Sequence, residues 1–406
     1  MWRSTCVRFL KPLVHVIKSN ARRPPGKIFM PSGFDSVGVS RAKLVATAVT
    51  LGTGGAAMLL AYCSHRSACV ALSPIVDHTR FVGEPITNLE TLLQNQDDMR
   101  RKMELFVLSA QADIIRELER FEDTKKFHVT RWMDPNEGSG VITCVIEDGD
   151  TFEAAHVTVS VTSNDSSVDV PSWPGLKTEG GNHHHATPQS IRLDSAIHPR
   201  NPNIPTLYFN YKYVELTDKT SNTVLSRWFE GGTDIVPYIL HEDDIRHYHR
   251  TLKKTCDLHD RTLYPVLKEE CDKHFYIQHR QEHRGLGGIY AKRIDGPSLQ
   301  DAFQLIRDCV RAVLPGYLPI VDRNKQRGYS YSDRDVQLKR RGRLVEFSLM
   351  YDECLKSEAE KSLGGQADNV MVSLPPNARW QPGPDSKTSP EGSTLYEALK
   401  TPREWV

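Results

Sequence analysis

The segment 205–237 constrains the fold more than any other part of the chain. Two runs of strand-forming residues flank the polar, turn-forming segment 217–223, a pattern that predicts a β-hairpin. Successive side chains of a strand point to opposite faces of the sheet. One face of the first strand is therefore apolar and able to pack on a core, with Leu207, Phe209, Tyr211 and Tyr213. The other face is polar-tipped, with Tyr208, Asn210 and Lys212.

The second strand of this hairpin adds a carboxylate. Gly231 and Gly232 turn the backbone without side-chain bulk, and Asp234 follows them. A polar strand face that leads to a glycine turn and an acid is typical of the wall of a ligand site. A half-exposed antiparallel strand followed by an ordinary loop fits the same pattern.

Composition excludes several classes of function. The chain has 406 residues, of which 39% are hydrophobic, and a net charge of +1, so it can form one large domain or two ordinary ones. The small net charge gives no overall field for nucleic acid or for an anionic membrane. The eight cysteines contain no Cys-x-x-Cys pair, and we interpret them as buried thiols rather than as zinc ligands or disulfides.

The first 64 residues have the composition of a targeting segment. Residues 1–34 lack Asp and Glu and are rich in Arg and Lys, as in organelle transit peptides. We therefore assign residues 1–43 to a mitochondrial presequence. The uncharged run 44–64 is long enough to cross a bilayer. It is either a sorting segment for the intermembrane space or a single-pass anchor that associates the protein with the inner membrane.

Hydrophobic periodicity predicts the elements of the first half of the remaining chain. Apolar residues recur at steps of three or four from Met99 to Phe121, which predicts a long amphipathic helix. Alternating runs at 141–147 and 151–161 predict a hairpin around Asp148 and Gly149. Residues 162–190 are predicted to be loop, and the His183–His185 run within them lacks the partners of a metal site.

The second half is predicted to be mostly helical. A helix starts near Glu242, and His249 within it is interpreted as a surface residue. Ser298 to Asp301 has the pattern of a capping box and begins a helix that we expect to end at Pro315 and Gly316. Three further elements are expected near the C-terminus: a strand over 344–351 led by the basic run 339–343, a core strand over 369–374 and a short helix near Leu395. Hairpin-connected strands followed by long helices predict an α+β fold, with one domain over residues 80–406.

Several motifs occur in the order known from one family. They include His198-Pro-Arg-Asn-Pro, Trp228-Phe-x-Gly-Gly-x-Asp234, Arg284-Gly-x-Gly-Gly-Ile289 and Arg340-Arg-Gly-Arg-x-Val-Glu-Phe347. Over about residues 99–406 the chain resembles the aerobic, oxygen-dependent coproporphyrinogen III oxidases. The resemblance implies an α+β fold with a large antiparallel sheet covered by helices on both faces, a homodimer, and no metal or organic cofactor. It also implies a location in the mitochondrial intermembrane space.

The resemblance further implies a reaction in heme biosynthesis. Two propionates of coproporphyrinogen III are oxidatively decarboxylated to vinyls, dioxygen is consumed as co-substrate, and protoporphyrinogen IX is formed. Asp234 takes the role of the carboxylate that holds the pyrrole N–H groups, and Tyr208 stands at the proton donor's position. The residues implied in substrate binding are Asp194, Asn210, Tyr211, Lys212, Arg284, Gly365 and Gln366.

The chain departs from the family pattern at several of these positions. Tyr208 stands where the family has His, Lys212 where it has Arg, and Asp194 where it has Ser. Glu230 replaces the first Gly of a triple, and Gln366 replaces an Arg. Lys212 keeps the charge of the arginine and loses its fork, but several of the other changes remove positive charge or add negative charge around the expected pocket. Two hypotheses therefore remain. The chain is a divergent oxidase, with this or another porphyrinogen as substrate, or a non-catalytic paralogue that binds or assembles within a mitochondrial complex.

Overall fold

A computed structural model of the protein describes residues 77–94, 97–134, 138–163, 186–352, 371–381 and 390–406. Residues 78–406 form one compact unit. The predicted presequence, the 44–64 run, His183–His185, Gly365 and Gln366 lie outside the described residues. Within the described residues, no helix combines the length and hydrophobicity needed to span a membrane.

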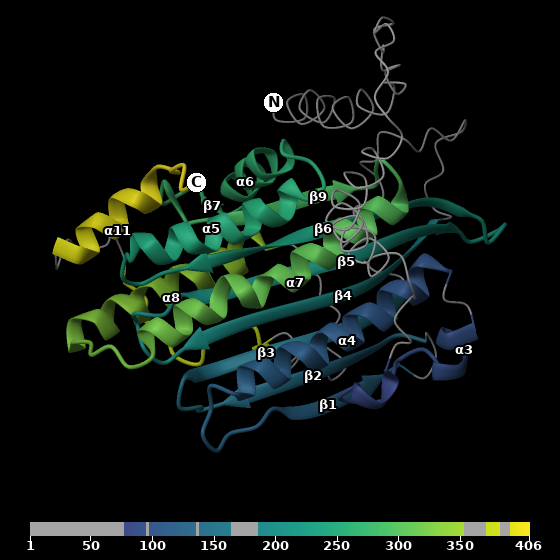
Figure 1. Ribbon diagram of the computed structural model, residues 1–406, viewed down its shortest axis with the longest axis horizontal. Helices are drawn as coiled ribbons and strands as arrows, with labels where there is room; N and C mark the ends of the chain where they lie inside the picture. The colour runs from purple at the N-terminus through teal and green to yellow at the C-terminus, as the bar shows by residue number, and fades with distance from the viewer. Residues whose placement is uncertain (1–76, 95–96, 135–137, 164–185, 353–370, 382–389) are drawn as a thin grey trace, which may run out of the picture. The chain divides into compact units, whose positions relative to one another are not determined.

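A seven-stranded antiparallel sheet forms the centre of this unit (Figure 1). Its strands follow chain order except that β9 pairs with β6. They are β1 (His128–Met133), β2 (Gly140–Glu147), β3 (Phe152–Ser163), β4 (Ala186–Pro199), β5 (Thr206–Asp218), β6 (Val224–Val236) and β9 (Gly288–Ile294). A separate pair consists of β7 (Tyr276–Ile277) and β8 (Glu282–His283).

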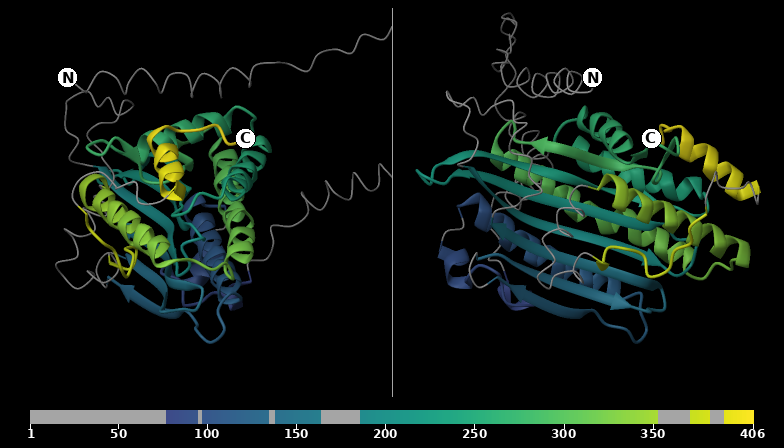
Figure 2. Two further views of the ribbon diagram at one scale, coloured as in Figure 1. Left: turned by 90° about the vertical axis from the view of Figure 1, so that its left-hand side faces the viewer. Right: turned by 180° about the vertical axis from the view of Figure 1, so that it is seen from behind.

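Helices lie on both faces of the sheet. α4 (Met99–Glu119), α5 (Glu242–Asp257) and α7 (Leu299–Asn324) cover one face, and α8 (Tyr331–Tyr351) lies on the other (Figure 2, left). The remaining helices are η1 (His78–Arg80), α3 (Leu89–Gln94), α6 (Leu263–His274) and α11 (Pro390–Lys400). This confirms the predicted α+β class with an antiparallel sheet between helices.

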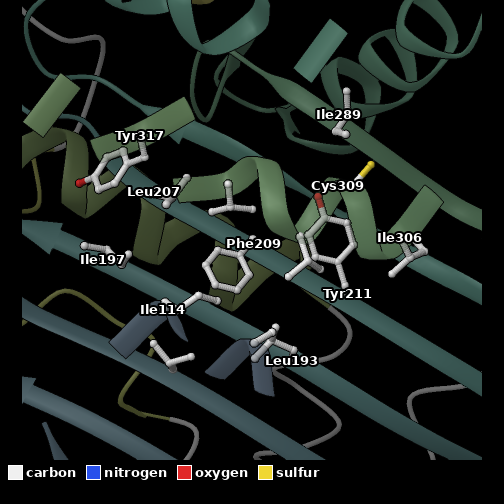
Figure 3. Close-up of a cluster of buried hydrophobic side chains, with 14 of the residues drawn as sticks. Ile114, Leu193, Ile197, Leu207, Phe209, Tyr211, Ile289, Ile306, Cys309 and Tyr317 are labelled. Carbon is white, nitrogen blue, oxygen red and sulfur yellow. The ribbon is translucent and has the colours of Figure 1, made fainter. Parts of the chain in front are cut away.

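The predicted hairpin of 205–237 is confirmed as β5 and β6. Leu207, Phe209 and Tyr211 of β5 point into the main core and pack with α4 and α7 residues such as Ile114 and Cys309 (Figure 3). The opposite face of β5 carries Tyr208, Asn210 and Lys212, as alternation requires. The hydrophobic effect thus fixes the register of the strand, because a slip of one residue would exchange the two faces.

Two strand predictions fail because burial and partners differ from the local pattern. Residues 344–351 are not a strand: they form the end of α8, whose Arg340, Arg341 and Arg343 are buried. These arginines were expected to be solvated or to meet carboxylates, and they meet Glu282, Glu153 and Glu346. In the described part of the predicted 369–374 strand, Met371 is helical and exposed, and a turn follows it.

Three other predictions are corrected. β4 begins at Ala186 and is much longer than the Asp194–Pro199 segment expected to enter the hairpin. α7 does not end at Pro315 but continues to Asn324, because the buried residues Ile320 and Val321 beyond the proline compensate for its missing hydrogen bond. His249 is buried rather than exposed: its ring contacts the Tyr264 hydroxyl and the Leu286 carbonyl.

Candidate functional site

The polar side chains of β3 to β6 form three cross-strand rows on the sheet face opposite the main core. We name this surface the polar face. The first row is His156, Ala196, Tyr208 and Asp234; the second is Thr158, Asp194, Asn210 and Gly232; the third is Ser160, Arg192, Lys212 and Glu230. The antiparallel register therefore brings five predicted site residues, Tyr208, Asp234, Asp194, Asn210 and Lys212, onto one surface.

Asp234 is the buried acid of the polar face. Only 2% of its surface is exposed, and its Oδ1 accepts a hydrogen bond from Arg284 Nη2 at 2.6 Å. Burial raises the pKa of Asp234, and the charge of Arg284 acts against this shift. Its second oxygen, Oδ2, has no hydrogen-bond partner among the described residues. A buried carboxylate oxygen without a partner is costly, so this atom is ready to accept hydrogen bonds from a bound ligand.

Arg284 is held in position by aromatic rings. Its guanidinium carbon lies 3.7 Å from the centre of the Phe275 ring, 5.0 Å from Phe347 and 4.9 Å from Tyr208. Contacts of this kind attract a cation to the ring faces. The arginine is thereby fixed against Asp234, and its Nε has no partner within the part of the chain that the structure describes.

The backbone approaches itself closely where Asp234 is positioned. A Cβ atom at Gly232 would lie 2.0 Å from the Ile289 carbonyl oxygen, and one at Gly288 would lie 1.9 Å from that of Thr233. Side chains at either position would push β6 and β9 apart. The glycines of both strands are therefore required for the pairing that places Asp234 beside the segment that carries Arg284.

Tyr208 lies next to a buried histidine. Its hydroxyl is 3.4 Å from Nε2 of His198, which also donates a hydrogen bond to the Ser373 carbonyl at 3.1 Å. Because a carbonyl only accepts, Nε2 carries the proton. Burial lowers the pKa of His198 to about 3, so the ring is neutral and Nδ1 accepts from the Thr206 hydroxyl. Burial also raises the pKa of Tyr208 well above its ordinary value, so its hydroxyl keeps its proton.

The cations of the third row are ion-paired with residues of the same face. Lys212 is buried and its Nζ lies 3.3 Å from Oε1 of Glu230. Arg192 Nε lies 3.1 Å from Oδ1 of Asp194, and His156 Nε2 lies 3.1 Å from Oδ2. Burial alone would raise the pKa of Asp194, but Arg192 and His156 lower it. The carboxylate is therefore ionised at neutral pH.

Tyr211 does not belong to this site. Alternation places it on the core face of β5, where 1% of its surface is exposed and its hydroxyl has no partner among the described residues. The structure therefore does not bring Tyr211 together with the other residues that were predicted to bind substrate. Gly365 and Gln366, which were also predicted to bind substrate, lie outside the described residues.

Three residues that shape the site were not predicted from the sequence. His198 was recognised as part of a motif but given no role. Phe275 was not singled out, and Phe347 was assigned to a strand rather than to the inner side of α8. Only tertiary structure brings these rings to Tyr208 and Arg284. No group of three or more potential metal ligands occurs in the described ranges.

The fold and the site define a class of protein: a single α+β unit whose antiparallel sheet carries a buried acid–arginine pair on a polar face. A family model described as coproporphyrinogen III oxidase matches residues 102–405. The chain belongs to the coproporphyrinogen III oxidase family.

Individual relatives agree over most of the chain. It is 40% identical to the oxygen-dependent coproporphyrinogen-III oxidase of Drosophila melanogaster, over 88% of this chain and 92% of that protein. It is 38% identical to the mitochondrial enzyme of Mus musculus, over 80% of this chain and 73% of that protein. It is 33% identical to the chloroplastic coproporphyrinogen-III oxidase 1 of Arabidopsis thaliana, over 78% and 84% of the two chains.

Proposed function

We propose that this protein is an oxygen-dependent coproporphyrinogen III oxidase that acts in heme biosynthesis. It converts two propionates of coproporphyrinogen III to vinyls, with dioxygen as co-substrate, and releases protoporphyrinogen IX. The observation that carries this proposal is Asp234, a buried acid whose Oδ2 has no hydrogen-bond partner in the part of the chain that the structure describes. The names of the relatives supply the substrate. Nothing in the comparisons supports the alternative of a non-catalytic paralogue.

The site residues suit the chemistry of this substrate. The pyrrole N–H groups at the centre of the flexible tetrapyrrole are donors. Asp234 Oδ2, which is unpaired among the described residues, is the acceptor proposed for them. A carboxylate bonded to pyrrole N–H groups favours the loss of an electron from the electron-rich ring to dioxygen. Arg284 holds the other oxygen of Asp234 and keeps the acid oriented.

Tyr208 is the proposed proton donor. Its hydroxyl stays protonated at neutral pH, and its neighbour His198 has its own Nε2 proton directed to the Ser373 carbonyl and the tyrosine oxygen. The proton of Tyr208 is therefore left for the substrate side. Asn210, from the next row, is a polar contact for the tetrapyrrole.

The setting of the reaction is part of the proposal. The mouse, rat and human relatives are named mitochondrial, and the basic leader supports the same location, in the intermembrane space. The enzyme acts as a homodimer and uses neither a metal nor an organic cofactor. The 44–64 run provides for association with the inner membrane.

The test is turnover by the full-length chain. The protein receives coproporphyrinogen III in air, and the fluorescence of oxidised protoporphyrin is followed. We expect product, and we expect Asp234→Asn to lower kcat by about 10²–10³-fold, the usual loss when a group that stabilises charge in the transition state is removed. Asp308→Asn is the matched control, since Asp308 pairs with His259 and Arg307 away from the polar face.

Two results would contradict the proposal at different levels. A folded wild-type protein that forms no product above buffer would exclude the enzymatic function. A folded Asp234→Asn variant with the activity of Asp308→Asn would leave the function standing and refute the role of the acid.

A further inference from the structure

The charges of the polar face balance one another. Its three rows carry the cations Arg192 and Lys212 and the carboxylates Asp194, Glu230 and Asp234, and Arg284 adds a third cation from the segment before β9. Each cation lies within 3.3 Å of one of these carboxylates. The described residues of the face thus contribute three positive and three negative charges, in pairs.

Glu230 is held firmly against Lys212. Its Oε1 lies 3.3 Å from Lys212 Nζ, and its Oε2 accepts a hydrogen bond from Trp228 Nε1 at 3.1 Å. Both oxygens are engaged, so the carboxylate has one orientation. Lys212 is only 4% exposed, and a buried ammonium needs such a partner because desolvation is otherwise costly.

Asp194 stands in the same relation to Arg192. One oxygen lies 3.1 Å from Arg192 Nε and the other 3.1 Å from His156 Nε2. Asp194 and Glu230 occupy the second and third rows on either side of Asn210 and Lys212. Glu230 therefore lies in the row farthest from Asp234, and Asp194 lies in the middle row.

We propose that Glu230 and Asp194 are specificity-determining residues, which act as built-in counter-ions for Lys212 and Arg192. This inference rests on the proposed function. A substrate carboxylate that approached Lys212 or Arg192 would have to displace the carboxylate that is already paired with that cation. The end of the face nearest Glu230 therefore accepts an uncharged edge of the tetrapyrrole, with methyl or vinyl substituents.

The decisive variant is Glu230→Gln, which keeps the shape of the side chain and removes the negative charge that is paired with Lys212. Its matched control is Glu215→Gln, which removes one negative charge from the same hairpin, where Glu215 pairs with Arg227 on the strand's other face. The single variant Lys212→Gln and the double variant Lys212→Gln with Glu230→Gln complete a double-mutant cycle, which reports whether any gain depends on the lysine.

Two readouts are measured on the full-length variants. The first is the KM for coproporphyrinogen III. The second is equilibrium binding of two stable porphyrins, followed by fluorescence: coproporphyrin III with four carboxylates and deuteroporphyrin IX with two. A new charge-assisted contact is expected to tighten binding about tenfold. In Glu230→Gln we expect this gain for coproporphyrinogen III and for coproporphyrin III, and a smaller gain for deuteroporphyrin IX. We expect no gain in Glu215→Gln or in the double variant.

The outcomes separate the inference from the function on which it rests. Turnover by wild type together with equal KM values in Glu230→Gln and Glu215→Gln would refute the inference alone. An equal increase in the affinity of Glu230→Gln for both porphyrins would also refute the inference alone. If wild type and all variants fail both to turn over and to bind, the proposed function and the inference are both wrong. Binding without turnover refutes the enzyme, while the comparison of the variants still decides the role of Glu230.

Discussion

The two faces of the central sheet show how one strand serves two purposes. On the core face, Leu207 and Phe209 pack with side chains of α4 and α7, and shape and hydrophobicity are what matter (Figure 3). On the polar face, Tyr208 and Asn210 lie among ion pairs and hydrogen bonds, and the position of each charge is what matters. The core face therefore fixes the register, and the register then aligns the polar residues into rows.

The sharpest test of this difference is a pair of neighbours on β5. Phe209→Ala is expected to lower the free energy of unfolding by about 4 kcal/mol, because a buried aromatic ring is lost and a cavity remains. Asn210→Ala, on the other face, is expected to cost less than about 1 kcal/mol and to raise KM instead. Denaturant unfolding and steady-state kinetics on both variants measure this. Equal losses of stability in the two variants would mean that the two faces do not differ in this way.

A second test concerns the ion pairs that hold α8 to β3. Glu153 accepts hydrogen bonds from Arg334 and Arg341, both at 2.7 Å. We expect Glu153→Gln to destabilise the protein by about 3 kcal/mol at neutral pH, because the buried Arg341 would lose its counter-charge. The control is Glu346→Gln, whose ion pairs with Arg280 and Arg343 also involve α8 but lie nearer its end.

The same residue predicts a pH dependence. Burial alone would raise the pKa of Glu153, but Arg334 and Arg341 outweigh burial and lower it to about 2 from an ordinary 4.5. Since the folded pKa is the lower one, this contribution to stability is complete above about pH 4.5 and is lost as the pH falls toward 2. Stability measured over this range should therefore fall less steeply in Glu153→Gln than in wild type. Parallel curves would contradict the assigned shift.

The smallest expected effect separates Tyr211 from the site. Its hydroxyl is buried without a partner among the described residues. Tyr211→Phe removes an unsatisfied polar group and is expected to stabilise the protein by about 1 kcal/mol. KM and kcat should stay unchanged, whereas Tyr208→Phe should lower kcat. A raised KM in Tyr211→Phe would mean that Tyr211 contributes to substrate binding after all.

The sequence by itself determined those elements whose periodicity is strong. The hairpin of β5 and β6, the long helix α4 and the hairpin of β2 and β3 follow from alternation or from three-to-four spacing, because burial acts on each residue according to its face. The same alternation predicted that Tyr208, Asn210 and Lys212 share a surface. The motifs supplied Asp234 and Arg284, and the family match confirms the resemblance on which they rest.

The choice of ion-pair partners depends on the tertiary structure. From the sequence, the arginines of α8 were predicted to precede a strand. In the structure they pair with carboxylates that are far away in the chain. The aromatic contacts of Arg284 and the pairing of Lys212 with Glu230 likewise depend on register and on packing between elements. Local patterns report hydrophobic burial residue by residue. An ion pair depends on the positions of two side chains in space, and these are fixed only when the sheet and its helices have come together.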